Sequence, residues 1–335
     1  MGGRLHPAVA RVRVAVRSAL DRLERGDVVV VACSGGADSL VLASASVFEG
    51  HKRGLRIVGA TVDHGLQEGS AAQAARVVEQ LAALGVDETV SARVQVDGGG
   101  LGPEAAARRA RYAVLGEIAE RFRAGTVLLG HTRDDQAETV LLGLAHGSGG
   151  RSLAGMRREY AEGPVAYVRP LLDVARDEVH TACRVEGLAA WDDPHNSDPG
   201  YARVRVRRRV LPVLEEELGP GIAATLARTA DQLRADMDLL DDVARAAYAG
   251  LAQAPDLSVE ALLAQPTPIR RRVLRLAALA AGAPAGELFH DHVLAMDALL
   301  VDWHGQRWVD LPGHLRCLRR DGTLRLESTR PSGDR

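Results

Sequence analysis

The chain has 335 residues, 46% of them hydrophobic and 26% charged, and its formal net charge is −2 at pH 7. This composition excludes an intrinsically disordered chain, and the length is sufficient for two domains. No segment approaches the roughly 18 consecutive apolar residues of a membrane span. Charges occur throughout the first 26 residues, which argues against a signal peptide. We therefore expect a cytoplasmic protein without a membrane partner.

Cysteine and lysine contents narrow the chemistry further. The three cysteines, Cys33, Cys183 and Cys317, are widely spaced, which predicts small packed side chains rather than a disulfide framework or a Cys-x-x-Cys metal site. Lys52 is the only lysine, so nearly all basic residues are arginines. Arginine suits bidentate phosphate contacts. The alternative is a general preference for arginine over lysine that has no functional meaning.

From residue 28 to about 190, short β-rich segments alternate with longer amphipathic ones. The expected strands are 28–32, 56–63, 89–96, 126–131 and 165–170. The expected helices are 39–49, 70–85, 103–124, 133–144 and 174–188. The alternation predicts an α/β fold with a doubly wound, mainly parallel five-stranded sheet and helices on both faces. Ligands bind such sheets beyond the carboxyl ends of the strands.

The alternation of strand-like and helix-like segments stops after about residue 215. Ala/Leu-rich helical segments follow, and the stretch Trp303 to Glu327 resembles short strands joined by Gly-containing turns. We therefore divide the chain into a catalytic domain at 1–217 and a smaller, mostly helical domain at 218–335.

The segment after the first strand is the strongest chemical signal. It reads Ser34-Gly35-Gly36-Ala37-Asp38-Ser39, between four valines and a helical run. A strand, two glycines and a helix start bring several backbone N–H groups together, which predicts a phosphate-binding loop. The pattern lacks the Gly-Lys-Ser/Thr end of a Walker motif and the third glycine of a dinucleotide fingerprint. At the end of the second strand, Asp63 and His64 are expected at the same nucleotide site.

A second segment, Gly130 to Thr139, places His131, Asp134 and Asp135 where a strand becomes a helix. One of the two carboxylates is explained by helix N-capping. The other, together with Asp38, would offer hard oxygen ligands to Mg²⁺ bound to a triphosphate; we expect Asp38 and Asp135 in that role.

Two further segments carry arginines. On the expected helix 103–124, Glu104, Arg108 and Arg111 share one face, which is either a solvated ion-pair couple or a phosphate contact. A later run is a candidate RNA-backbone contact, with a solvated face as the alternative. Its proposed tRNA-binding members are Arg203, Arg205, Arg207 and Arg208.

Taken in order, these motifs resemble the tRNA(Ile)-lysidine synthetase family of the pyrophosphate-loop ATP pyrophosphatase superfamily. The resemblance covers residues 27 to 213 and rests on S-G-G-A-D-S, V-D-H-G-L, E-A-A-A-R-R-A-R-Y, G-H-T-R-D-D-Q-A-E-T, G-S-G-G-R-S-L-A-G-M, R-P-L-L and W-D-D-P-H-N. It implies an adenine-nucleotide α-hydrolase-like fold. The sequence departs from the family pattern at Gln67, His146, Ser152, His195 and Val204.

The resemblance implies a ligase that uses ATP, Mg²⁺, free lysine and the isoleucine tRNA with a CAU anticodon, with a C-terminal domain that contacts the tRNA. The wobble cytidine would be O-adenylated with release of pyrophosphate, and lysine would then displace AMP from carbon 2. Residues 34–39 would bind phosphates, Arg108 or Arg111 would stabilise the α-phosphate, and Asp134, Asp135 or His131 would act as general base.

Alternatives at this point are another amidating or thiolating enzyme with the same loop, or a non-catalytic adenine-nucleotide sensor. A homodimer is also open.

Overall fold

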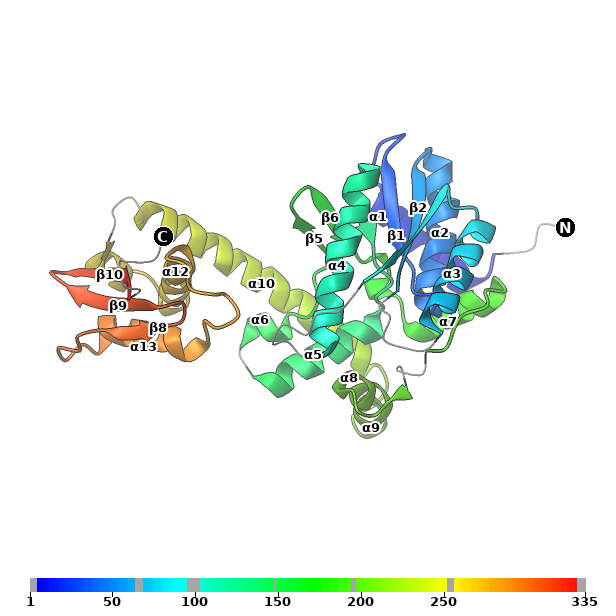
Figure 1. Ribbon diagram of the computed structural model, residues 1–335. Helices are drawn as coiled ribbons and strands as arrows, with labels where there is room; N and C mark the ends of the chain where they lie inside the picture. Colours follow the sequence, from blue (N-terminus) through cyan, green and yellow to red (C-terminus); the bar gives the residue numbers. More distant parts are fainter. Residues whose placement is uncertain are drawn as a thin grey trace. The chain divides into compact units, whose positions relative to one another are not determined.

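A six-stranded sheet organises the N-terminal part of the computed structural model, which describes residues 5–63, 69–94, 103–147, 149–193, 197–251 and 256–329 (Figure 1). The strands are β1 (Val28–Ala32), β2 (Arg56–Asp63), β3 (Glu88–Arg93), β4 (Thr126–Leu128), β5 (Glu159–Glu162) and β6 (Val165–Val168). Their order is β3-β2-β1-β4-β6-β5, and all pairs are parallel except β5 with β6. The predicted mainly parallel sheet is confirmed, with β5 as an additional antiparallel edge strand.

Helices cover both faces of this sheet. One face packs against α1 (Pro7–Leu20), α2 (Ala37–Arg53), α3 (Ser70–Leu84) and α7 (Arg176–Val185), and the other against α4 (Pro103–Phe122). The chain also forms α5 (Arg133–His146), α6 (Gly150–Leu153), α8 (Ala202–Arg205) and α9 (Leu211–Glu217). A 3₁₀ turn, η1 (Pro170–Asp173), precedes α7, and a π-helical turn, η3 (Val206–Val210), joins α8 to α9. The five helices expected from the sequence are all present; α1 was not predicted.

Alternation along β1 shows how the sheet receives its two layers. Val29 and Val31 are buried in a core with residues of α1, α2, α3 and α7, whereas Val30 is buried in a second core with Leu115 of α4. Each fully buried valine contributes on the order of 1.5–3 kcal/mol relative to an exposed one. The four-valine strand is therefore held from both faces, and its carboxyl end has a fixed position.

The C-terminal part has its own core and sheet. Its elements are α10 (Ile222–Leu251), β7 (Leu257–Ser258), α11 (Val259–Leu263), α12 (Thr267–Ala280), α13 (His290–Val301), β8 (Val309–Leu311), β9 (Leu315–Arg320) and β10 (Thr323–Ser328). The antiparallel sheet has the order β7-β10-β9-β8. The Asp297 carboxylate accepts hydrogen bonds from Arg270 at 2.7 Å and Arg271 at 2.8 Å, which ties α12 to α13. Helices followed by short strands were expected here.

Contacts divide the chain into two compact units. The first comprises Met1–Gly147 with Ser152–Asp231, and the second Ser148–Arg151 with Gln232–Arg335. The division falls inside α10, later than the boundary at 217 and 218 that we inferred from composition. The three cysteines are buried, as their spacing suggested. None of the helices in the described ranges is long and apolar enough to cross a bilayer.

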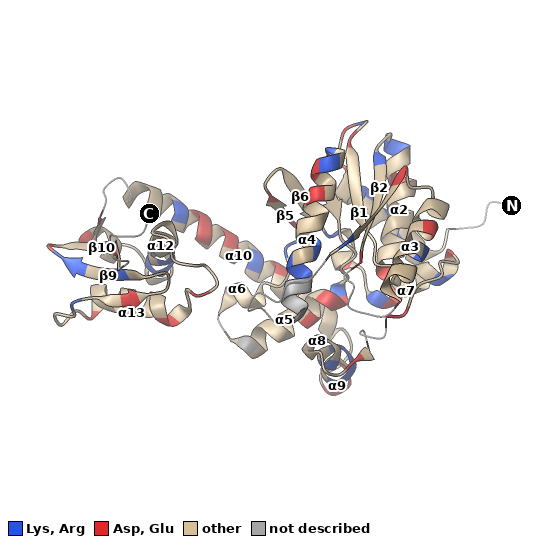
Figure 2. Ribbon diagram, viewed as in Figure 1, with Lys and Arg blue, Asp and Glu red and all other residues tan. Residues whose placement is uncertain are grey.

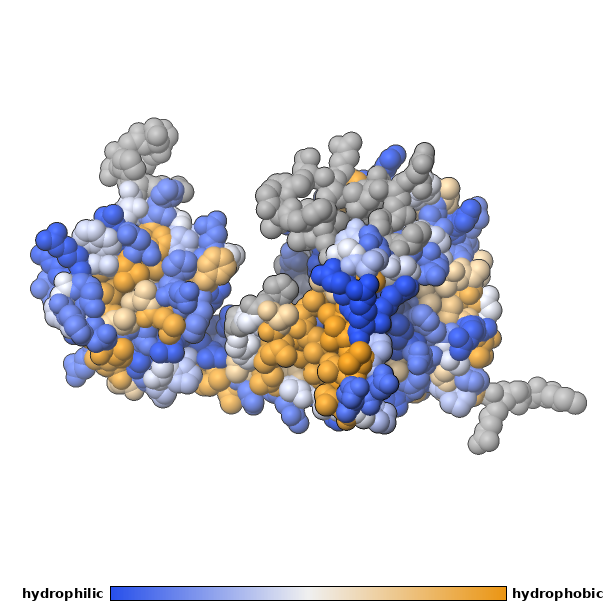
Figure 3. Space-filling model, turned by 90° about the horizontal axis from the view of Figure 1, so that it is seen from below, coloured by the Kyte–Doolittle hydropathy of each residue, from blue (hydrophilic) through white to orange (hydrophobic). Residues whose placement is uncertain are grey.

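Apolar side chains are exposed on α5 and α9 of the first unit. The exposed fractions of Leu144 and Val213 are 63% and 54%. In Figure 1, α5 and α9 lie at the lower side of the first unit. Figure 3 views the molecule from below and shows an apolar surface, in orange, on that side. The α5 helix also carries, at its other end, the acidic residues of the site described next.

Candidate active site

The loop from Ser34 to Ser39 connects β1 to α2, as predicted, and its last three residues form the first turn of α2. The Ser39 hydroxyl accepts a hydrogen bond from the Ser34 backbone N–H at 3.1 Å and donates one to the Gly36 carbonyl at 2.9 Å. Gly35 has a φ of +84°, and a Cβ there would lie 2.6 Å from Cγ2 of Val77. The loop therefore requires glycine at this position, and α2 begins within the loop, so that first-turn N–H groups belong to the loop.

Asp38 stands in the first turn of α2 with an unsatisfied oxygen. Among the described residues, its Oδ1 is buried without a hydrogen-bond partner, and Nε2 of His180 lies 3.8 Å away. Burial and the neighbouring Asp135 raise the pKa of Asp38 to about 7, although Arg176 and Arg207 oppose the shift. A half-buried carboxylate with a free oxygen at the mouth of a phosphate loop is suited to a cationic or proton-sharing partner.

The raised pKa predicts how stability depends on pH. In the folded chain the pKa of Asp38 is about 7, above its ordinary value of 3.8, so the folded state binds the proton more tightly. This contribution to stability is full below the unfolded pKa and is lost as pH rises through about 7. Asp38→Asn, which is neutral, should therefore raise Tm more at pH 8 than at pH 5. Thermal unfolding of both proteins at the two pH values measures this, and an equal difference at both would contradict it.

The capping contact is made by Asp135, the residue expected to bind Mg²⁺, and not by its neighbour Asp134. The Oδ2 of Asp135 accepts hydrogen bonds from the backbone N–H of Thr132 at 2.8 Å and from the Thr132 hydroxyl at 2.9 Å. Its Oδ1 accepts from Arg176 at 2.8 Å and Arg207 at 3.2 Å. Although burial opposes ionisation, the Arg176 guanidinium holds the pKa of Asp135 below its ordinary value. The neighbouring Asp134 accepts from the backbone N–H of Arg176 at 2.8 Å.

Glu138, one turn further along α5, is fully buried among three arginines. Its carboxylate accepts hydrogen bonds from Arg176 at 3.0 Å and from Arg207 at 2.7 and 3.0 Å, and its Oε2 lies 3.3 Å from Nε of Arg203. Figure 2 shows acidic positions on α5 and basic positions on α8. Sequence reasoning missed Glu138 and Arg176; the available signal was the spacing of three between Asp135 and Glu138, which places both on one helix face.

The arginine run after residue 200 divides into two groups. Arg203 and Arg207, four residues apart, point toward Asp135 and Glu138 of α5, which gives them a place in the site rather than on an outer surface. Arg205 and Arg208 are exposed; Arg205 donates to the Pro199 and Gly200 carbonyls and Arg208 to the Ser197 hydroxyl. Helical geometry therefore separates residues that the sequence presents as one charge run.

A third group lies around His131, at the end of β4. Burial, together with the charges of Arg169, Arg111 and Arg108, lowers the pKa of His131 to about 3, although Asp135 opposes the shift, so the imidazole is neutral at pH 7. A base with so low a pKa accepts protons weakly. Burial also lowers the pKa of Arg111. Sequence reasoning missed Arg169, which is buried and donates to the Tyr112 hydroxyl at 3.2 Å; it belongs to the R-P-L-L segment.

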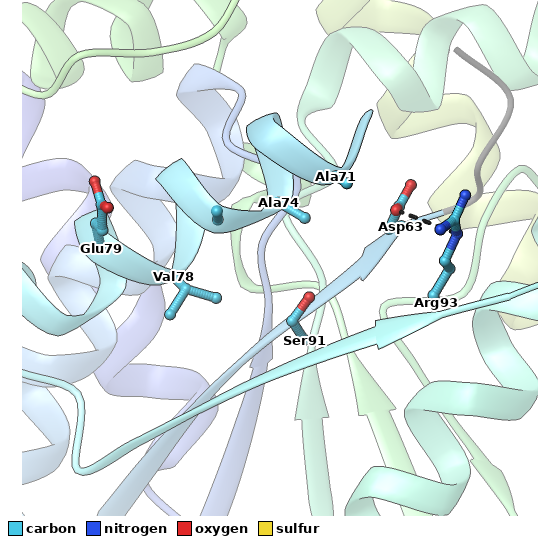
Figure 4. Close-up of a pocket in the computed structure, with 8 residues that line it drawn as sticks. Asp63, Ala71, Ala74, Val78, Glu79, Ser91 and Arg93 are labelled. Atoms are coloured by element: carbon cyan, nitrogen blue, oxygen red, sulfur yellow. Dashed lines mark ion pairs between the residues drawn. The ribbon is translucent and has the colours of Figure 1, made fainter. Parts of the chain in front are cut away.

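Asp63 is the last residue of β2, which is the neighbour of β1 in the sheet. Its Oδ2 is 3.8 Å from Nε of Arg93, and both residues border a pocket of about 450 Å³ between α3 and strands β2 and β3 (Figure 4). The pocket runs along α3, and Asp38 is not among the residues that line it. Figure 4 shows small side chains of α3, such as Ala71 and Ala74, along the pocket. His64, Gln67 and His195 lie outside the described residues, and the side chains of Glu104 and His146 are likewise not described.

Two family models match the chain. The PP-loop domain matches residues 11–214, and the TilS substrate binding domain matches residues 257–325. A tRNA(Ile)-lysidine synthase from Thermobifida fusca is 54% identical over 319 residues, which cover 95% of this chain and 97% of that protein. The chain belongs to the tRNA(Ile)-lysidine synthase family. Another member, from Streptomyces coelicolor, is 49% identical over 346 residues, covering 95% of this chain and 98% of that protein.

A solved structure shows the same fold outside the lysidine synthase family. The U34-tRNA thiolase NcsA from Methanococcus maripaludis, with its [4Fe-4S] cluster, superposes with a TM-score of 0.57 at 21% identity, covering 68% of this chain and 79% of that chain. The family resemblance drawn from the sequence motifs and the predicted fold class are both confirmed.

Of the two carboxylates expected to bind Mg²⁺, only Asp38 has a buried oxygen without a hydrogen-bond partner among the described residues. The unpartnered Oδ1 of Asp38 fits a hard cation, because Mg²⁺ prefers carboxylate oxygens. Asp135 already receives four donors, so it could bind a cation only by releasing an arginine. Within the described ranges no three His, Cys, Asp or Glu side chains converge on one point. A cation at Asp38 would thus draw further ligands from elsewhere, and nucleotide phosphates supply such oxygens.

Proposed function

We propose that this chain ligates free lysine to carbon 2 of the wobble cytidine of the CAU-anticodon isoleucine tRNA, with conversion of ATP to AMP and pyrophosphate. The observation that carries the proposal is the match to both domain models together with 54% identity over 95% of the chain to a tRNA(Ile)-lysidine synthase. The site geometry supports the same reaction, because a phosphate loop, a carboxylate with a free oxygen and buried arginines adjoin one another.

The first step joins the cytidine to the nucleotide. The cytosine O2 attacks the α-phosphorus of ATP, the bond to the β-phosphate oxygen breaks, and pyrophosphate leaves. Backbone N–H groups of residues 34–39 would hold the phosphates, and Asp38 would hold Mg²⁺, which would offset phosphate charge when bound. Arg108 and Arg111, whose charges act on the pKa of His131, would stabilise the charge that develops at the α-phosphate.

The second step replaces the nucleotide with lysine. The lysine amine attacks carbon 2, the C–O bond to the adenylate breaks and AMP leaves, while the nitrogen gives up a proton to a base. Three residues are candidates for the base. His131 is a weak base because its pKa is lowered, and the Asp135 carboxylate already accepts hydrogen bonds from four donors. Within the described part of the chain, the Asp134 carboxylate accepts one hydrogen bond, from the backbone N–H of Arg176, which favours it as the base.

Transfer of labelled lysine tests this function. The chain is incubated with ATP, Mg²⁺, radiolabelled lysine and an isoleucine tRNA transcript with the CAU anticodon. The expected result is label in the tRNA, and none in a matched transcript with uridine at the wobble position. Incorporation of ammonium or sulfide without lysine would instead favour an amidating or thiolating enzyme.

We further propose that the enzyme uses Mg²⁺ and works in the cytoplasm. We also propose that the C-terminal unit contacts the tRNA. The proposed assembly is a homodimer, which sedimentation would test. The TilS substrate binding domain match to residues 257–325 supports a substrate contact by the C-terminal unit.

The exposed arginines of α8 and η3 are proposed to contact the tRNA backbone. Arg205→Gln with Arg208→Gln should weaken tRNA binding and lower the slope of log K against log salt by about one for each lost phosphate contact. Filter binding between 50 and 200 mM salt measures this, with Arg11→Gln, an exposed arginine of α1, as the control. An unchanged slope in the double variant would assign Arg205 and Arg208 to loop stabilisation alone.

A further inference from the structure

Arg176 contacts three acidic residues of α5 at once. Its backbone N–H donates to Asp134 at 2.8 Å, its Nη1 to Glu138 at 3.0 Å and its Nη2 to Asp135 at 2.8 Å. The side chain is only 16% exposed. As the first residue of α7, Arg176 thus connects the start of one helix to the start of another.

The starts of α5 and α7 are also joined through the backbone. The N–H of Arg133, the first residue of α5, donates to the carbonyl of Val174 at 3.0 Å, just before α7. Two helix N-termini that lie together favour carboxylates, and the Thr132 cap holds Oδ2 of Asp135. The planar guanidinium of Arg176 fixes the other oxygen, Oδ1, relative to Glu138, because its two nitrogens bind the two carboxylates at once.

Loss of Arg176 would affect the two carboxylates unequally. Glu138 would keep Arg203 and both hydrogen bonds from Arg207, so its charge would remain paired. On Oδ1, Asp135 would keep only the 3.2 Å hydrogen bond from Arg207. The consequence should therefore be a misdirected Asp135 rather than an unpaired buried charge.

We propose that Arg176 is a positioning residue for adenylation: it holds the Asp135 carboxylate, and with it the start of α5, in place beside the phosphate loop, where Gly130 lies against the backbone of Asp38. This inference rests on the proposed function. Arg176 does not need to touch ATP, because its three partners all belong to α5. The hydrogen bonds that shape the phosphate loop run from Ser34 to Ser39 and from Ser39 to Gly36, so they do not pass through Arg176.

Steady-state pyrophosphate release by the full chain, with ATP, Mg²⁺, tRNA and lysine present, tests the proposal. Arg176→Gln should lower kcat by about 10- to 100-fold, the scale of a reacting group misplaced by about 1 Å. The KM for ATP should stay within about threefold, because the loop is intact. Guanidinium chloride at tens of millimolar should restore part of kcat. The control is Arg184→Gln on the same helix, an exposed arginine that donates to the Thr181 hydroxyl; it should behave as wild type.

Arg176→Lys provides a second variant in case the Gln variant fails to fold. A lysine ammonium keeps the charge but cannot bind two carboxylates as a fork, so kcat should again fall while KM for ATP holds. Wild-type kcat in either folded variant would overturn the proposal, and so would equal losses in kcat and ATP affinity without rescue by guanidinium. An inactive wild-type chain would instead count against the proposed function itself.

Discussion

Asp38→Asn is expected to lower ATP-dependent pyrophosphate release by at least ~100-fold, the scale of one lost preorganised electrostatic contact. Asparagine keeps the shape of the side chain but removes the charge that would hold a cation on phosphate. Among the described residues the Oδ1 of Asp38 has no hydrogen-bond partner, and Nε2 of His180 lies 3.8 Å away, so no hydrogen bond needs to break for this oxygen to act.

Release of pyrophosphate at saturating ATP, Mg²⁺ and tRNA measures this effect. Asp21→Asn, which alters an exposed carboxylate paired with Arg53, is the control and should turn over like wild type. The Asn variant should also be more stable than wild type at pH 8, since it removes a buried ionised group; lost activity with gained stability separates a functional role from a structural one. Near-normal turnover would remove Asp38 from the mechanism.

Asp135→Asn is expected to lose both activity and stability. Four donors converge on the Asp135 carboxylate, two from Thr132 and one each from Arg176 and Arg207. An amide has one oxygen and one NH₂ group, so either the helix cap or the arginine contacts must be lost. Removal of one partner from a buried ion pair costs about 3–5 kcal/mol. We expect a loss of this size in the free energy of unfolding, with pyrophosphate release reduced at least ~100-fold.

Urea unfolding and pyrophosphate release together check this prediction. Asp134→Asn is the matched stability control, because Asp134 accepts the N–H of Arg176 and an asparagine oxygen can accept the same bond. Its cost should be within about 1 kcal/mol. Lysine transfer by this variant reports separately on the general base. If both variants lost the same stability, the four-donor account of Asp135 would be wrong.

The phosphate loop and the start of α5 could be predicted because each is formed by one continuous segment of the sequence. Four valines before two glycines indicate a buried strand that runs into a phosphate loop, and His131 to Asp135 indicate a strand end that becomes a capped helix. The structure shows these at the carboxyl ends of β1 and β4, which are adjacent and parallel. Their closeness follows from the sheet topology that the alternating pattern predicts.

Other features depend on contacts between distant segments. Arg176 and Glu138 are 38 residues apart in the chain, and nothing in either segment alone marks them as partners. The arginine run after residue 200 was interpreted as one surface because no helix was predicted there, whereas α8 and η3 turn Arg203 and Arg207 inward. The β5 strand was missed because it is a short, half-exposed edge strand without strong alternation.

Pyrophosphate release from ATP and Mg²⁺, with and without CAU-anticodon isoleucine tRNA and in the absence of lysine, tests the central claim most directly. Adenylation of the cytidine precedes the use of lysine, so we predict release that requires this tRNA and stops near one equivalent per tRNA until lysine is added. Release that ignores the tRNA, or tight ATP binding with no release under any RNA, would contradict an adenylating site at Asp38 and the phosphate loop.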